Sequence, residues 1–127
     1  MPAARCSEAT GLLTAMRGEV RGYFCSDRPD FETWRPERAE DVFLTLDVYM
    51  GCAGGEGTDI FSIVIATPQA IRGRPERRKG KLLVVQQYDW QTIKGTLEEW
   101  VAACERLTWE EVVDCLRQRF SWEFEGM

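Results

Sequence analysis

Apolar and polar side chains alternate most regularly between positions 42 and 50. One side of this stretch carries only apolar residues, namely Val42, Leu44, Leu46, Val48 and Met50. The other side carries Phe43, Thr45, Asp47 and Tyr49. A period of two residues is that of a half-buried β-strand. A glycine-rich segment at 51–58 and a second apolar run at 59–66 follow, so the pattern predicts a hairpin of two strands. The glycines are not a phosphate-binding loop, because they lack the Gly-Lys-Ser/Thr ending and a helix after them.

A helical period replaces the alternation in the last third of the chain. The first predicted helix follows Asp89 as its N-cap, and its apolar stripe consists of Trp90, Ile93, Leu97, Trp100, Val101 and Cys104. The second begins after Thr108, and its stripe consists of Trp109, Val112, Val113, Leu116 and Phe120. Thr108 and Glu111 have the spacing of a capping box. Gly95 costs the first helix about 1 kcal/mol relative to alanine, so we expect it to mark a close approach of the sheet.

Weaker patterns complete the predicted architecture. Residues 17–25 resemble a strand weakened by two glycines; residues 82–88 are apolar enough for a strand buried on both faces. Thr67 and Pro68 favour a short helical turn, and residues 121–125 alternate again. We therefore predict an α+β domain, with an antiparallel β-sheet of about four to five strands and two C-terminal α-helices packed on one face. Residues 1–16 are expected to be a flexible N-terminal extension, and residues 17–127 a single domain.

Composition limits the classes of function that the chain can have. With 127 residues, one domain is expected. No apolar run is long enough to span a membrane, and residues 1–8 lack the hydrophobic region of a signal peptide. The five cysteines form no Cys-x-x-Cys motif, which favours reduced thiols in the cytoplasm. The absence of histidine removes the most common general base and zinc ligand, so we expect no cofactor, no metal site and no enzyme.

The charge of the chain is unevenly distributed. The net charge is −5, yet residues 72–81 contain six of the 16 basic side chains and one of the 21 acidic ones. The remainder is strongly acidic, which favours a basic protein partner over nucleic acid. The sheet face opposite the helices mixes aromatic and acidic residues. If no other segment covers that face, it is the best candidate for a partner surface.

Four segments, in order along the chain, resemble one family. They are Asp59–Pro68, Leu83–Trp90, Thr108–Val112 and Trp122–Glu125. Together they are similar to the Immunity protein 8 family of bacterial polymorphic toxin systems, over about residues 17–125. The chain departs from that pattern at Cys52 and at 69–71, and its basic segment is longer. The resemblance implies a cytoplasmic protein without catalytic activity that binds a cognate toxin domain and protects the producing cell.

The resemblance and the acidic charge together suggest where the toxin domain would bind. The hypothetical toxin contacts are Asp47, Tyr49, Glu56, Asp59, Glu123 and Glu125. The exposed side of the first helix, with Glu98, Glu99 and Glu105, is the other candidate surface. The acidic charge would suit a nuclease as the toxin, because acidic inhibitors complement basic nucleic-acid enzymes. The sequence does not determine the toxin's chemistry or the oligomeric state.

Two other classes of function remain open at this point. A small enzyme would use paired carboxylates such as Asp47 and Glu123, which need different environments within a cleft. A nucleic-acid-binding module would use residues 72–81. That segment has no interleaved aromatic residues, which favours a solvated loop.

Overall fold

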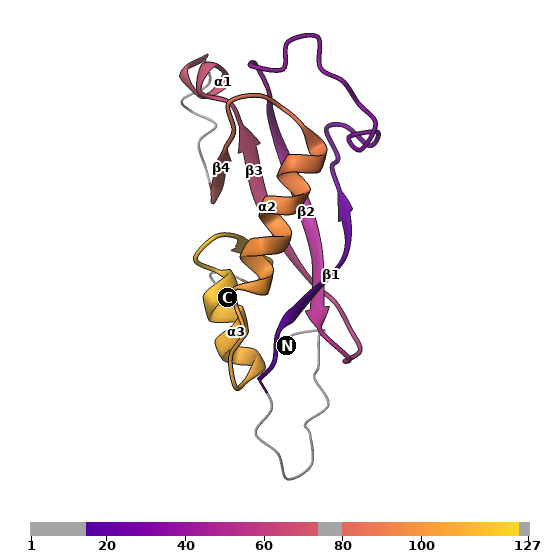
Figure 1. The fold of residues 1–127 in the computed structure, drawn as a ribbon, viewed down its shortest axis with the longest axis vertical. Coiled ribbons are helices and arrows are strands. Elements are labelled where there is room, and N and C mark those ends of the chain that lie inside the picture. Colours follow the sequence, from indigo (N-terminus) through magenta and orange to yellow (C-terminus); the bar gives the residue numbers. More distant parts are fainter. Residues whose placement is uncertain (1–14, 74–79, 125–127) are drawn as a thin grey trace.

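The computed structural model describes residues 15–73 and 80–124 of the chain. The helices are α1 (Pro68–Gly73), α2 (Trp90–Ala102) and α3 (Trp109–Leu116). The strands are β1 (Gly18–Phe24), β2 (Phe43–Cys52), β3 (Asp59–Ala66), β4 (Leu82–Val84) and β5 (Ser121–Trp122) (Figure 1). Within these described ranges, no helix is long and apolar enough to cross a membrane.

All five strands belong to one sheet, built around the hairpin that the alternation predicts. The order is β1-β2-β3-β4, and β5 also pairs with β3. The β1–β2, β2–β3 and β3–β5 pairs are antiparallel. The prediction of an α+β domain with four to five strands and two helices in the C-terminal half is confirmed.

Strand β4 differs from the prediction in direction, length and burial. It runs parallel to β3, because the chain turns through α1 before it returns to the sheet. It has only three residues, and Val84 is 47% exposed, so it is not buried on both faces. The apolar run that suggested a long strand continues into the approach to α2. There Tyr88 is buried, but its backbone amide donates to the Ala39 carbonyl and not to a strand of the sheet.

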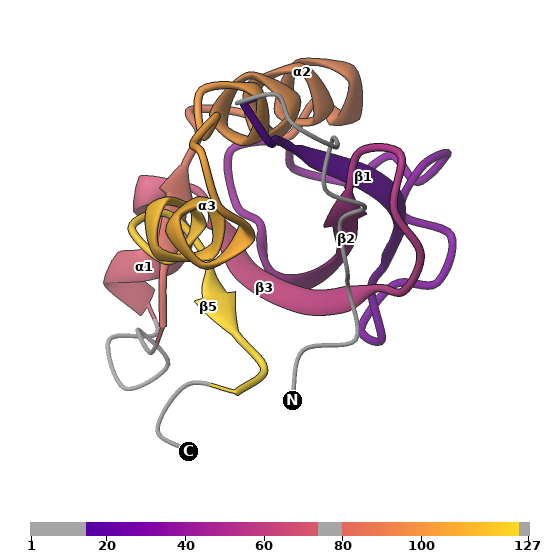
Figure 2. The same cartoon turned by 90° about the horizontal axis from the view of Figure 1, so that it is seen from below.

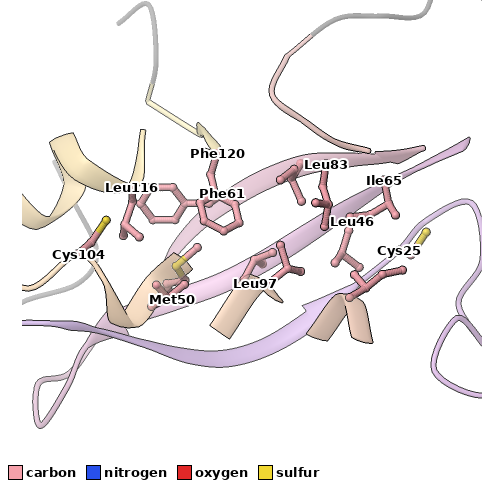
Figure 3. Close-up of a cluster of buried hydrophobic side chains, with 14 of the residues drawn as sticks. Cys25, Leu46, Met50, Phe61, Ile65, Leu83, Leu97, Cys104, Leu116 and Phe120 are labelled. Carbon is pink, nitrogen blue, oxygen red and sulfur yellow. The ribbon is translucent and has the colours of Figure 1, made fainter. Parts of the chain in front are cut away.

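The sheet is strongly curved, and the helices lie along its open side. Figure 2 shows β1, β2 and β3 as a curved wall, with α2 and α3 beside the open part of the curve. Leu46, Val48 and Phe61 point inward and are at most 1% exposed. The apolar stripes of both helices meet them, and Figure 3 shows Leu97, Leu116 and Phe120 in the same cluster as Phe61. The two alternating faces of β2 therefore divide as predicted, with the aliphatic face in the core.

Local signals explain where the two long helices begin. Thr108 is the N-cap of α3, and its side chain and that of Glu111 form the predicted capping box. Asp89 is the N-cap of α2, but its carboxylate accepts a hydrogen bond from the Thr92 hydroxyl at 2.6 Å and none from a helix amide. The expectation for Gly95 is wrong, because a Cβ added there would have no heavy atom within 4 Å.

The prediction of reduced cysteines is wrong for Cys52, Cys104 and Cys115. Cys104, just after α2, forms a disulfide with Cys115 in α3, with their Cα atoms 5.6 Å apart. Cys52 is also disulfide-bonded, whereas Cys25 is free and buried. The prediction of reduced thiols rested on an odd count and on compartment, neither of which reports proximity. Here the short connection between the helices folds back and brings two cysteines together.

Two predicted segments fall partly outside the described residues. The first is the expected N-terminal extension, of which residues 1–14 lie outside the described part of the chain. At its end, Met16 pairs with Arg106 in an isolated antiparallel bridge. Residues 74–79, most of the basic segment, also lie outside, so its expected role as a loop stays a prediction.

Candidate functional site: the outer face of the sheet

The side of the sheet that faces away from α2 and α3 carries the candidate residues in two rows. We call it the outer face and define it by Phe24, Asp47, Tyr49, Ile60, Ser62, Ser121 and Glu123. In one row, Asp47 of β2 lies opposite Phe24 of β1 and Ser62 of β3, and Ser62 lies opposite Ser121 of β5. In the other row, Tyr49 lies opposite Ile60, whose carbonyl accepts a hydrogen bond from the Glu123 amide at 3.0 Å. Directly paired residues of an antiparallel ladder share a face, so the register brings three predicted contacts onto one surface.

Asp47 is the central carboxylate of the outer face. The Asp47 side chain makes no hydrogen bond and no ion pair with any residue that the structure describes. Partial burial raises the pKa of its side chain above the usual value, because desolvation penalises the ionised form. Asp47 is thus a partly desolvated charge without a described counter-ion, and a cation from a partner would compensate it.

Apolar and aromatic surface surrounds this carboxylate. Phe24 is 44% exposed, and Tyr49 and Ile60 are half-buried. The two rows contain no lysine or arginine. The nearby guanidinium of Arg21 donates hydrogen bonds to the carbonyl oxygens of Cys52 (2.9 Å) and Gly55 (2.8 Å). The outer face is therefore apolar with carboxylates, a composition that suits a partner surface presenting basic and apolar groups.

Glu123 has a structural role that its sequence pattern did not reveal. Its side chain accepts a hydrogen bond from the Ile60 amide at 3.1 Å, while its own amide bonds to the Ile60 carbonyl. The residue thus continues the pairing beyond the two residues of β5. Its carboxylate stabilises the edge of β3 and is only in part available to a partner.

The other three predicted contacts differ in position. Glu56 is exposed in the β2–β3 hairpin, which Arg21 fixes through the two hydrogen bonds described above. Asp59 lies on the inner side of β3, opposite the buried Met50, and is 0% exposed. Its side chain is therefore not part of the outer face. The alternation along β3 places Asp59 in phase with the buried Phe61, a signal that the choice of contacts by charge did not take into account. Glu125 lies outside the described residues.

Phe24 is the surface residue that sequence reasoning missed. It ends the weak strand β1, whose glycines and bulge between Val20 and Gly22 obscure the alternation. After the bulge, Tyr23 packs inward against Trp90 with ring centroids 5.0 Å apart, and Phe24 points outward. The signal was present only as two successive aromatic residues, of which one had to face outward.

The geometry does not favour paired-carboxylate chemistry. Strand β3 separates Asp47 from Glu123, which also lies two residues along from the position opposite Asp47, so their backbones are about 12 Å apart. The Glu123 carboxylate is also engaged by a backbone amide. Within residues 15–73 and 80–124, no group of three histidine, cysteine or carboxylate side chains is placed to hold a metal ion.

The exposed side of α2 is the second predicted surface. Glu98, Glu99 and Glu105 are all exposed. Burial, with the nearby charges of Glu98 and Glu32, raises the pKa of Tyr23 to about 12. This side is acidic as expected, but its carboxylates are exposed, and solvent screens their charge more than that of Asp47.

Comparison with known proteins gives one match. The model of a family described as Immunity protein 8 matches residues 18–127, which include every strand and helix of the structure. No curated protein and no solved structure matches the chain.

Proposed function

The chain belongs to the Immunity protein 8 family, and we propose from this membership that it binds a cognate bacterial toxin domain and neutralises it by direct contact. The proposed action is not catalytic: the bound protein blocks the toxin's active site or its access to substrate. The site of action is the cytoplasm of the producing cell. The proposed toxin domain is basic, and a nuclease is one enzyme class with that charge.

We propose the outer face as the toxin-binding surface. The observation that carries this proposal is Asp47, a partly desolvated carboxylate without a described counter-ion, set between Phe24 and Tyr49. A basic side chain of the toxin would bind Asp47, and apolar toxin groups would cover the two aromatic residues. Glu56 and Glu123 lie further out and would steer association more than they contribute to affinity. Glu125 stays a proposed contact of the same rim.

Growth rescue tests the proposed class of function. The cognate toxin domain, taken from the gene next to that of this protein, is expressed in a sensitive host with and without this protein. We expect growth only when both are present, and co-elution of the two proteins in size-exclusion chromatography. Continued killing together with separate elution would end the proposal.

A matched pair of charge reversals tests the proposed surface. Asp47→Lys places a cation at the centre of the outer face, and Glu99→Lys makes the same charge change on the exposed side of α2. We expect Asp47→Lys to weaken toxin binding by about 3 kcal/mol and Glu99→Lys to change it by less than about 0.5 kcal/mol, as measured by calorimetry. The opposite ranking would move the binding surface to α2 while leaving the proposed function intact.

A further inference from the structure

The disulfide between Cys104 and Cys115 joins the end of α2 to α3, and its two cysteines differ in exposure. Cys104 follows α2 and is 3% exposed, whereas Cys115 in α3 is only partly buried. No other cysteine lies between them in the sequence. Helix α3 has only eight residues. Helices of that length are marginal in isolation, so α3 depends on the contacts and links that hold it on the core.

Arg106 lies against the sulfur of Cys115, the more exposed cysteine of the pair. Its guanidinium donates a hydrogen bond to Cys115 Sγ at 3.4 Å. The arginine is itself held in place, because its backbone pairs with Met16 and its side chain also donates to the Glu105 carbonyl. Of the nearby carboxylates, Glu111 is engaged with Thr108 and Asp114 with Arg117. A cation next to a thiol favours its thiolate and so activates it as a nucleophile.

We propose that Cys104 and Cys115 are a redox-active pair that exchanges with low-molecular-weight disulfides such as oxidised glutathione, with Cys115 as the attacking sulfur. Reduced Cys115 attacks as the thiolate on one sulfur of the small disulfide, forms a mixed disulfide and releases one small thiol. Cys104 then loses its proton to solvent and attacks Cys115 Sγ, which releases the second small thiol. Two protein thiols are thereby oxidised and one small disulfide is reduced to two thiols, so atoms and electrons balance.

The expected consequence is a reversible covalent lock between α2 and α3. Disulfides in reducing compartments are usually transient, catalytic or redox-sensing. In the proposed cytoplasmic location the pair would be open at rest and would close when small disulfides accumulate. The lock is close to the proposed binding surface in sequence, because α3 leads directly into β5 and Glu123. The exchange chemistry itself does not depend on the proposed function or on the compartment.

A pair of single-cysteine variants tests the asymmetry between the two sulfurs. The folded full-length variants Cys104→Ser and Cys115→Ser are incubated with oxidised glutathione, and peptide mass spectrometry locates the modification. We expect one glutathione on Cys115 of the first variant and none on Cys104 of the second. The buried, free Cys25 is an internal control that should stay unmodified. Equal modification of both variants, or no modification of either, would overturn the proposal.

Two arginine substitutions test the activation of Cys115. In the Cys104→Ser background, Arg106→Gln should slow the reaction with oxidised glutathione roughly threefold at neutral pH and move the pH midpoint of the rate upward. Arg106→Lys should restore the wild-type profile, and Arg119→Gln, whose guanidinium lies over Trp100, should leave it unchanged. An unaltered profile in Arg106→Gln would remove Arg106 from the mechanism.

Thermal unfolding tests the lock. The oxidised wild-type protein should unfold about 10 °C above the double variant Cys104→Ser/Cys115→Ser, because closing the connection between the helices restricts the unfolded chain. Because Cys52 is disulfide-bonded as well, both proteins are also compared after reduction, and there their Tm values should coincide. If the oxidised wild type and the oxidised double variant unfold within about 2 °C of one another, a shift that corresponds to well under 1 kcal/mol for a domain of this size, the pair is not a lock.

Discussion

The two faces of strand β2 differ in how far folding alone explains the residues that they carry. The inner face, with Leu46, Val48 and Met50, is at most 1% exposed and packs against both long helices. The outer face has Asp47 and Tyr49 at alternate positions, both partly exposed. Folding accounts for every side chain of the inner face. It does not account for a carboxylate that is partly desolvated and has no described counter-ion, which is why we propose the outer face as the binding surface.

The largest expected effect comes from a truncation on the inner face. Leu46→Ala should destabilise the protein by about 3 kcal/mol, because it removes buried methyl groups and leaves a cavity. The outward neighbour provides the control, since Thr45→Ala should cost about 1 kcal/mol or less. Urea unfolding of both variants measures the difference. Equal losses would show that the two faces do not differ in packing.

Gly51 of β2 is a position on the outer side of the sheet where a larger side chain has no room. A Cβ at Gly51 would lie 2.6 Å from the Gly57 carbonyl oxygen and 2.6 Å from Arg21 Nε. Gly51→Ala should therefore cost about 2 kcal/mol, because the hairpin and its arginine have to move. Gly22→Ala is the matched control, since nothing lies within 4 Å of its added Cβ. The prediction fails if the two variants have the same urea midpoint.

A substitution of Gly95, on the exposed side of α2, should stabilise the protein instead of destabilising it. Gly95→Ala should raise the free energy of unfolding by about 1 kcal/mol, because alanine restricts the unfolded chain and the site in α2 is open. Gly18→Ala makes the same change on the inner side, where the added Cβ would lie 3.2 Å from Val101 Cγ1. We expect no gain there, and thermal unfolding separates the two.

These contrasts show which parts of the fold could be predicted from the sequence. The two faces of β2 and the capping box at Thr108 and Glu111 are local signals, and both are confirmed. The parallel pairing of β4 and the Cys104–Cys115 bond depend on how distant segments come together, which periodicity does not encode. For the candidate site, alternation indicated Asp47 and Tyr49, but it did not reveal that Glu123 bonds the Ile60 amide.

The smallest expected change in stability is also the most informative, and it concerns Asp47. Partial burial raises the pKa of this carboxyl in the folded state, so the folded protein binds the proton more tightly than the unfolded chain does. The ionised group therefore opposes folding above its folded pKa, and this cost disappears as the pH falls below the unfolded pKa. Asp47→Asn should raise the free energy of unfolding at neutral pH by on the order of 0.3 kcal/mol after solvent screening.

The gain from Asp47→Asn should vanish near pH 3, where both proteins are neutral at this position. The same substitution should weaken toxin binding by about 2 kcal/mol, because it removes the partner of a basic toxin side chain. Urea unfolding at pH 7 and pH 3, combined with calorimetry against the toxin domain, measures both effects. A variant that is more stable yet binds less tightly would mean that Asp47 is retained at a cost to folding. A variant that loses stability while binding normally would assign Asp47 to the fold and leave the outer face without its central contact.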